Sequence, residues 1–250
     1  MRNQSSGASI VTDTLSIAGL VLGLVATAAG AAAQAAIGMG FNLFAVPLLA
    51  LIDPVFVPGP VLMHGFLLSI AVSWRLRADI NVREVGISVC GLLAGTALAA
   101  IALSFMSAES LPRVFGGLVL VAVAVTAACV RVPLSVASIL VASAVAGVMG
   151  TVAGVHGPPI ALLYQGESPA RIRSALLPFF VFGNALALLA LAGIGMLGWR
   201  EVAAAAVLAP GLALGYLASP WLVRVMSPGA IRASILAISA VSGLALMVKG

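Results

Sequence analysis

Few residues in this chain could take part in chemistry, and those inside its apolar stretches are uncharged. The two histidines, His64 and His156, lie in long apolar runs, and Asn42 and Asn184 are rare amides in similar surroundings. Either amide could donate a hydrogen bond to an oxyanion. Glycine and proline clusters adjoin Asn42 and His156, where free backbone N–H groups would add donors. These residue types favour binding of a small anion over covalent catalysis.

The sequence lacks the motifs of common enzymes. It contains no Walker phosphate-binding loop, no Gly-x-Ser-x-Gly and no His-Glu-x-x-His. Two histidines and two cysteines, Cys90 and Cys129, are too few for a convincing catalytic zinc site with its supporting residues. We therefore expect no enzyme activity, no metal and no cofactor. A haem held between helices by His64 and His156 is a remote alternative.

The composition indicates that most of the chain lies in lipid. Of 250 residues, 62% are hydrophobic and 8% are charged, and the mean hydropathy is +1.23. A soluble domain is about half apolar and about a quarter charged, so this chain has too few polar groups to cover a surface in water. Its net charge of +5 comes from thinly spread basic residues, which favours membrane topology over nucleic-acid binding. We expect residues 1–250 to form a single membrane domain.

Charged residues divide the chain into apolar runs, because a charge at the bilayer centre is costly. Most runs have the roughly 20 residues that one crossing needs. Two are longer, with 39 residues between Asp13 and Asp53 and 35 between Arg131 and Glu167. Each of these two runs has a helix-breaking cluster near its middle, so we expect each to form a hairpin of two helical segments. Three single crossings follow each hairpin along the chain. Whether the hairpins cross fully or re-enter stays open.

This pattern occurs twice, at about residues 15–130 and 134–249. Four matches support a duplication: Gly38 with Gly157, Arg83-Glu84-Val85 with Arg200-Glu201-Val202, Gly91–Gly95 with Gly211–Gly215, and Met106-Ser107 with Met226-Ser227. We predict an all-α polytopic membrane protein of two homologous halves. Five segments in each half would make the halves inverted repeats. The alternative is eight transmembrane helices arranged as four plus four, with parallel halves.

The basic residues favour the inverted arrangement. If the loop of Arg75, Arg77 and Arg83 is cytoplasmic, inversion places eight basic residues inside and four outside. This asymmetry agrees with the positive-inside rule. The other basic residues expected inside are Arg131, Arg171, Arg173, Arg224 and Arg232.

Inverted halves with broken segments are typical of secondary transporters, in which the breaks meet near the membrane midplane. Helices that start at the two breaks would present N–H groups and partial positive charge to a cavity, which suits an anion. Since no run has a charged residue in its interior, a coupled proton would have to travel on a histidine or on the substrate. The candidate substrate-binding residues are Gly38, Met39, Gly40, Phe41, Asn42, His64, His156, Gly157, Pro158, Pro159 and Asn184.

The glycine-rich breaks resemble the motifs of a known family. The first reads Gly38-Met39-Gly40-Phe41-Asn42 with Pro47 beyond it, and the second runs from Gly147 to Pro159, followed by Ser168–Arg173 and Phe182-Gly183-Asn184. These segments resemble the TauE/SafE sulfite-exporter-like permeases, and the resemblance covers nearly the whole chain. It implies a multi-pass transporter of the bacterial inner membrane for sulfite, an organosulfonate or a related sulfur-containing or carboxylate anion.

Several functional questions stay open at this point. A passive anion channel or an accessory subunit is the alternative to a carrier. The expected partners are the small anion, the lipid bilayer and a coupling proton, and no nucleic acid. The transported anion, the direction, the coupling ion and the oligomeric state do not follow from the sequence.

Overall fold

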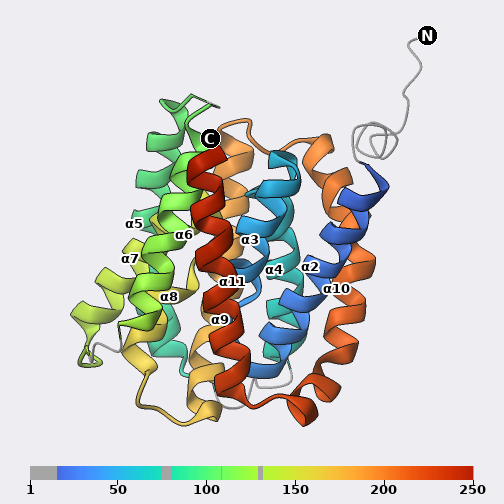
Figure 1. The fold of residues 1–250 in the computed structure, drawn as a ribbon. Helices are drawn as coiled ribbons and strands as arrows, with labels where there is room; N and C mark the ends of the chain where they lie inside the picture. Colours follow the sequence, from blue (N-terminus) through green and yellow to red (C-terminus); the bar gives the residue numbers. More distant parts are fainter. Residues whose placement is uncertain (1–15, 75–79, 108, 129–131, 250) are drawn as a thin grey trace.

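The computed structural model describes residues 16–74, 80–107, 109–128 and 132–249, and within these ranges it is all α-helical without strands (Figure 1). The first half contains α2 (Ile17–Ile37), α3 (Phe41–Ile52), the 3₁₀ turn η1 (Pro54–Phe56), α4 (Gly59–Ser73), α5 (Val82–Ser104) and α6 (Leu111–Ala127). The second half contains α7 (Val136–Ala153), α8 (Gly157–Ala161), the 3₁₀ turn η3 (Leu162–Tyr164), α9 (Pro169–Gly193), α10 (Trp199–Val225) and α11 (Pro228–Lys249).

Seven helical segments in the described ranges are long and apolar enough to cross a membrane. They are α2, the stretch Pro54–Ser73 that includes α4, α5, α7, α9, α10 and α11. Helices α3 and α6 are also apolar, but shorter. The predicted all-α polytopic fold is confirmed, and the chain is a multi-pass membrane protein.

Both predicted helix breaks are present, and each begins with a glycine in the left-handed conformation. Helix α2 ends at Gly38 with φ 86°, and α7 ends at Gly154 with φ 77°. Glycine adopts this conformation without the strain that a Cβ would bring. Gly154 thus ends its helix in the same way as Gly38, three residues before Gly157, with which the sequence pairs Gly38; the repeat pairing itself stays a prediction.

The second arm of each hairpin is short. Helix α3 has 12 residues and α8 has five, continued by the turn η3. Pro47 in α3 has no N–H, so the carbonyl of Leu43 lacks its usual helical donor. Oγ of Ser239 on α11 lies 2.8 Å from that oxygen and 2.6 Å from the carbonyl oxygen of Ile235 in its own helix, so its one hydrogen is shared between them. This contact connects α3 to α11 at the start of α3.

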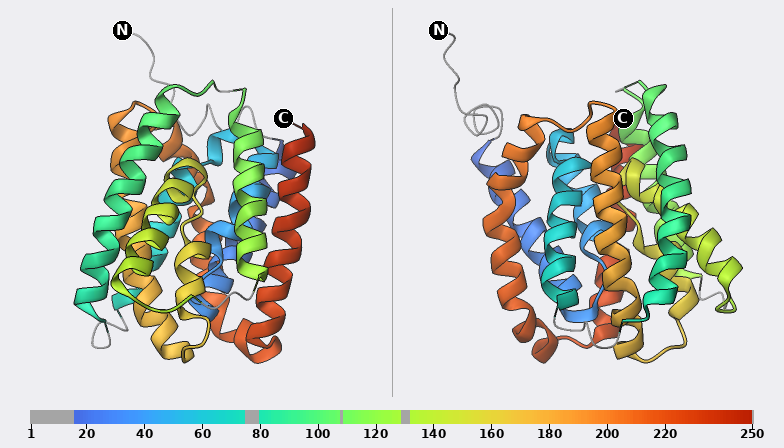
Figure 2. Two further views of the ribbon diagram at one scale, coloured as in Figure 1. Left: turned by 90° about the vertical axis from the view of Figure 1, so that its left-hand side faces the viewer. Right: turned by 180° about the vertical axis from the view of Figure 1, so that it is seen from behind.

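Helices of one half pack chiefly against helices of the other. Helix α2 packs along α10, α7 along α5, α4 along α9, and α6 along α11. Figures 1 and 2 show α2, α4 and α6 running in the opposite direction to α7, α9 and α11. This arrangement is the one that inverted halves would have, although the duplication itself stays a prediction.

The two closest of these contacts depend on glycine. A Cβ on Gly95 of α5 would lie 1.9 Å from the carbonyl oxygen of Ala144 on α7. A Cβ on Gly215 of α10 would lie 2.0 Å from the carbonyl oxygen of Ala28 on α2. Both distances are far below van der Waals contact, so the absence of a side chain is what lets each pair of backbones approach.

The described basic residues separate between the two ends of the bundle. Helices α5, α9 and α11 start, and α10 ends, at the lower end in Figure 1. These helix ends carry Arg83, Arg171, Arg173, Arg224 and Arg232, whereas the opposite end carries Arg113, Arg200 and Lys249. Arg2, Arg75, Arg77 and Arg131 lie outside the described residues. We refer to the lower end as the arginine-rich end, and expect it to be cytoplasmic.

Cysteine labelling in intact cells tests this orientation. In a background without Cys90 and Cys129, we expect Ser168→Cys at the arginine-rich end to be protected from an impermeant thiol reagent added outside. Gly198→Cys, before α10 at the opposite end, should be labelled. The reverse pattern would mean that the protein sits in the membrane the other way up, and labelling of both from outside would contradict the placement of these two sites at opposite ends.

Candidate functional site

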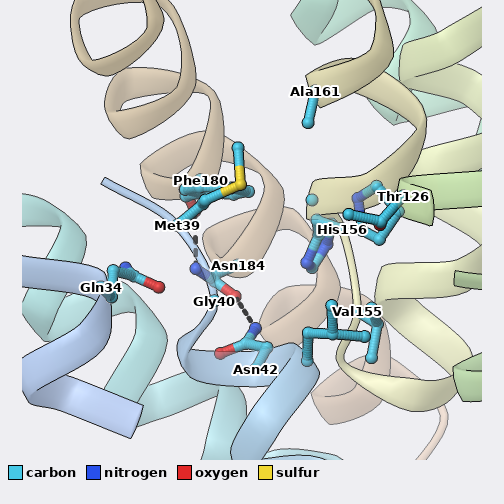
Figure 3. A pocket seen from close by; sticks show the side chains of 13 residues that line it. Gln34, Met39, Gly40, Asn42, Thr126, Val155, His156, Ala161, Phe180 and Asn184 are labelled. Carbon is cyan, nitrogen blue, oxygen red and sulfur yellow. Dashed lines mark hydrogen bonds between the residues drawn. The ribbon is translucent and has the colours of Figure 1, made fainter. Parts of the chain in front are cut away.

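A cavity lies where the two helix breaks meet, and we call it the central cavity (Figure 3). Its walls come from α2, α3, the end of α6, the break between α7 and α8, α8 itself and α9. It encloses about 450 Å³ including its mouth. The interior has room for roughly three water molecules, which is the size of a small oxyanion.

Seven of the predicted site residues line this cavity, namely Met39, Gly40, Asn42, His156, Gly157, Pro158 and Asn184. The other four are not among its lining residues. Gly38 ends α2 and packs against the side chain of Arg173, Phe41 is fully buried in the core, and Pro159 is buried in α8. Whether any of the eleven binds a substrate stays a prediction.

His64 is the fourth residue outside the cavity. Its Nε2 lies 2.9 Å from the carbonyl oxygen of Ala205 on α10, and its ring meets that of Phe41 edge to face at 6.3 Å. His64 therefore connects α4 to α10, and His156 is the histidine that reaches the cavity. In the described ranges, no group of three or more His, Cys, Asp or Glu side chains is placed to hold a metal ion.

The imidazole of His156 is buried without a hydrogen bond of normal geometry. It is 1% exposed, and neither ring nitrogen has a well-aligned partner within the described structure, although the backbone of Gly183 lies close to the ring. Two glycines make room for the ring, since a Cβ on Gly150 would lie 2.0 Å from its Cδ2 and one on Gly183 would lie 2.9 Å away. Leaving a buried polar group unpaired costs about 1–3 kcal/mol. A neutral His156 has one N–H, which no well-aligned acceptor of the described structure holds and which a ligand in the cavity could accept.

Asn42 and Asn184 form a hydrogen-bonded pair between the halves (Figure 3). Nδ2 of Asn42 donates to the carbonyl oxygen of Gly154 at 2.5 Å and to Oδ1 of Asn184 at 3.4 Å. Nδ2 of Asn184 donates to the carbonyl oxygen of Phe180 in its own helix at 2.8 Å. An amide nitrogen carries two hydrogens. Asn42 thus uses both between the halves, while Asn184 keeps one for a ligand.

The different partners of the two amides predict different effects on stability. Asn42→Leu leaves the carbonyl of Gly154 without its side-chain donor, and we expect it to lower the free energy of unfolding by about 1–3 kcal/mol. Asn184→Leu should cost less, because the carbonyl of Phe180 can still accept the backbone N–H of its own helix. Thermal unfolding of both variants in one detergent measures this order, and a larger loss for Asn184→Leu would contradict it.

The start of α3 is the stronger of the two helix N-termini at the cavity. No side chain caps it, so the N–H groups of its first turn and the positive end of its dipole face the break. Helix α8 has only five residues, and Pro158 and Pro159 in its first turn have no N–H. The second break therefore offers fewer backbone donors than the sequence reading assumed, and its main polar contribution is His156.

Six lining residues were not among the predicted ones: Gln34, Leu43, Thr126, Val155, Ala161 and Phe180. Gln34 could have been found from the sequence, because it is a polar residue in an apolar run. Its Nε2 donates to Ser69 Oγ at 3.1 Å. Thr126 could not. Its hydroxyl bonds to the carbonyl of Ala122 as in any helix, and only the fold brings the end of α6 beside the breaks.

A second polar cluster, at the arginine-rich end, holds the segment between η3 and α9. Glu84 at the start of α5 accepts hydrogen bonds from Tyr164 Oη at 2.9 Å and from Arg171, whose guanidinium also lies 5.5 Å from the centre of the tyrosine ring. Burial, together with the bond to Glu84, raises the pKa of Tyr164, so this hydroxyl remains a donor. The cluster fixes the second hairpin against α5.

The comparison with known families agrees with this architecture. Residues 22–246 match the model of the family described as sulfite exporter TauE/SafE. The chain belongs to the TauE/SafE family. This match confirms the resemblance seen in the glycine-rich breaks, and it identifies the chain as a member of a transporter family rather than an enzyme family. No curated protein and no solved structure matches the chain.

Proposed function

We propose that this TauE/SafE protein is a secondary carrier that moves a small sulfur-containing anion, such as sulfite or an organosulfonate, across the bacterial plasma membrane. The observation that carries the proposal is the buried imidazole of His156 in the central cavity, which has no well-aligned hydrogen-bond partner in the described structure. Family membership supports the proposed substrate class, and the cavity between the two helix breaks is where we propose that the substrate binds.

The central cavity would recognise an anion with neutral donors. His156 offers one N–H, Asn184 one amide hydrogen, and the start of α3 its backbone N–H groups. None of the described lining residues is charged. Affinity without a fixed positive charge should be modest, in the micromolar to millimolar range, where each factor of ten corresponds to about 1.4 kcal/mol. Modest affinity suits a carrier, which must release what it binds.

A site between oppositely directed hairpins also favours a carrier over a passive channel. In such folds, one part of the protein rocks or gates against the other around a fixed central site. A carrier exchanges labelled for unlabelled substrate, which is counterflow, whereas a channel only lets the gradient run down. Counterflow of sulfite in proteoliposomes therefore separates the two candidates, and leakage of sulfite without counterflow would favour the channel.

Substitutions of the two free donors test the location of the site. We expect His156→Gln and Asn184→Leu each to raise the apparent KM for sulfite counterflow about tenfold or more, because a hydrogen bond to a charged group contributes about 1.5–3 kcal/mol. His64→Gln is the matched control, since this buried histidine lies outside the cavity, and its KM should stay unchanged. If both cavity variants keep the KM of the unmodified protein, the anion binds elsewhere.

A further inference from the structure

A larger cavity opens at the arginine-rich end, and we call it the outer cavity. It encloses about 910 Å³ including its mouth, and Arg173 of α9 and Arg232 of α11 are the charged residues that line it. Pro228 and Gly229, in the first turn of α11, form another part of its wall. The outer cavity therefore combines two guanidinium groups with the start of a 22-residue helix, where Pro228 has no N–H and Ser227 Oγ caps the N–H of Ala230, so that the guanidinium groups are its main donors.

Neither guanidinium in the outer cavity has a carboxylate partner in the described part of the chain. The ion pair found there is that of Arg171 with Glu84, and Arg171 does not line this cavity. Arg232 donates from Nη2 to the carbonyl oxygen of Thr126 at 2.6 Å. Nε of Arg173 is buried and has no hydrogen bond to any described group. Charged donors that are partly removed from water and left unpaired favour binding of an anion.

The outer and central cavities are connected through lining residues that they share with a third cavity. A smaller intermediate cavity lies between them; it shares Thr126 and Pro158 with the central cavity, and Ile172 and Arg232 with the outer cavity. Met39 lines all three. It stands between Gly38 and Gly40, both in the left-handed conformation, and its unbranched side chain can change rotamer at low cost.

We propose that the outer cavity is a second oxyanion-binding site, in which Arg173 and Arg232 hold the anion before it passes Met39 into the central cavity. The role as an entry site rests on the proposed function, whereas binding of an oxyanion there does not. The phosphate of an anionic lipid headgroup has the same chemistry as a free oxyanion. The experiment must therefore distinguish these two sources.

Sulfite binding to the full-length protein in phosphatidylcholine nanodiscs tests the site. We expect two classes of binding, of which the outer one weakens with added salt because its guanidinium groups are closer to solvent. Arg173→Gln should lower the affinity of this class about tenfold or more while leaving the other unchanged. This variant is chosen first because the Nε of Arg173 makes no hydrogen bond that the change would break. Arg232→Gln should have the same effect and serves as the second variant.

Arg224→Gln is the matched control, because Arg224 is exposed at the same end, on α10, and does not line the outer cavity. It should leave both classes unchanged. Salt-sensitive sulfite binding that Arg173→Gln and Arg232→Gln leave as in the unmodified protein would overturn the proposal. So would an equal loss of this binding in Arg224→Gln, which would indicate a general effect of surface charge.

Nanodiscs that also contain phosphatidylglycerol identify the source of the oxyanion. Loss of the salt-sensitive sulfite binding in these discs would show that a lipid headgroup occupies the outer cavity, and unchanged binding would show that the cavity serves the free anion. Both results support an oxyanion site. Failure of the proposed carrier function is visible separately, as an absence of sulfite counterflow by the unmodified protein.

Discussion

Gly150→Ala is expected to reduce sulfite counterflow at least tenfold. The new methyl group would lie 2.0 Å from Cδ2 and 2.1 Å from Nε2 of His156, and both distances are far below van der Waals contact. Overpacking of a filled interior typically costs about 1–3 kcal/mol. The ring must therefore leave its place, and in doing so it either fills the central cavity or removes its N–H from the anion. Initial rates of counterflow and the apparent KM measure the loss.

Two further variants separate this effect from a general effect on α-helices. Gly117→Ala on α6 is the control, because nothing lies within 4 Å of the added Cβ, and it should transport as the unmodified protein does. Gly150→Ala combined with His156→Ala should recover thermal stability without recovering transport, since it removes the clash together with the donor. Normal counterflow by Gly150→Ala alone would mean that the position of His156 does not matter.

The hairpins could be predicted from the sequence because they follow from local chemistry and length. A run of 39 uncharged residues is too long for one crossing, and Gly38 and Gly40 supply the backbone conformations for a break at its middle. The same reasoning placed the second break between Gly154 and Pro159. It could not say which residue ends the first arm there, because Gly154 and Gly157 both adjoin the break and only the backbone angles show that Gly154 ends α7.

The role of Gly150 could not be predicted in this way. Gly150 and Gly154 are four residues apart, a spacing that by itself indicates close packing of one helix on another. In the structure Gly154 ends the helix, and Gly150 faces a side chain that returns across the break. Spacing along a helix shows which residues share a face. It does not show whether another helix or a single imidazole fills the space above them.

The arginines at the outer cavity were missed for a related reason. When charged residues are taken as the ends of apolar runs, every arginine is placed at the membrane surface. However, the side-chain carbons of Arg173 pack against Gly38, where an added Cβ would lie 2.7 Å from Cγ. A long side chain can thus bury its stem along an apolar surface and deliver its charge some distance away. The sequence shows where along a helix an arginine lies, but not where its guanidinium group ends up.

Gly95→Ala and Gly215→Ala are expected to destabilise the protein by similar amounts. Each new Cβ would lie about 2 Å from a carbonyl oxygen of the facing helix, and a backbone atom cannot move aside as a flexible side chain can. We expect each change to lower the free energy of unfolding by about 1–3 kcal/mol, only partly offset by the roughly 0.5–1 kcal/mol that alanine contributes to a helix over glycine. Thermal unfolding in detergent measures both losses.

Gly86→Ala in α5 is the matched control for these two variants, because it brings the same gain in helix propensity with nothing within 4 Å of the new Cβ. It should be neutral or slightly stabilising. If the two halves are inverted repeats, the contact of α5 with α7 is equivalent to that of α10 with α2. The Gly95 and Gly215 substitutions should then lower the stability by similar amounts. If one substitution were tolerated and the other prevented folding, the two helix contacts would contribute unequally to stability. This result would weaken the case for a duplicated origin.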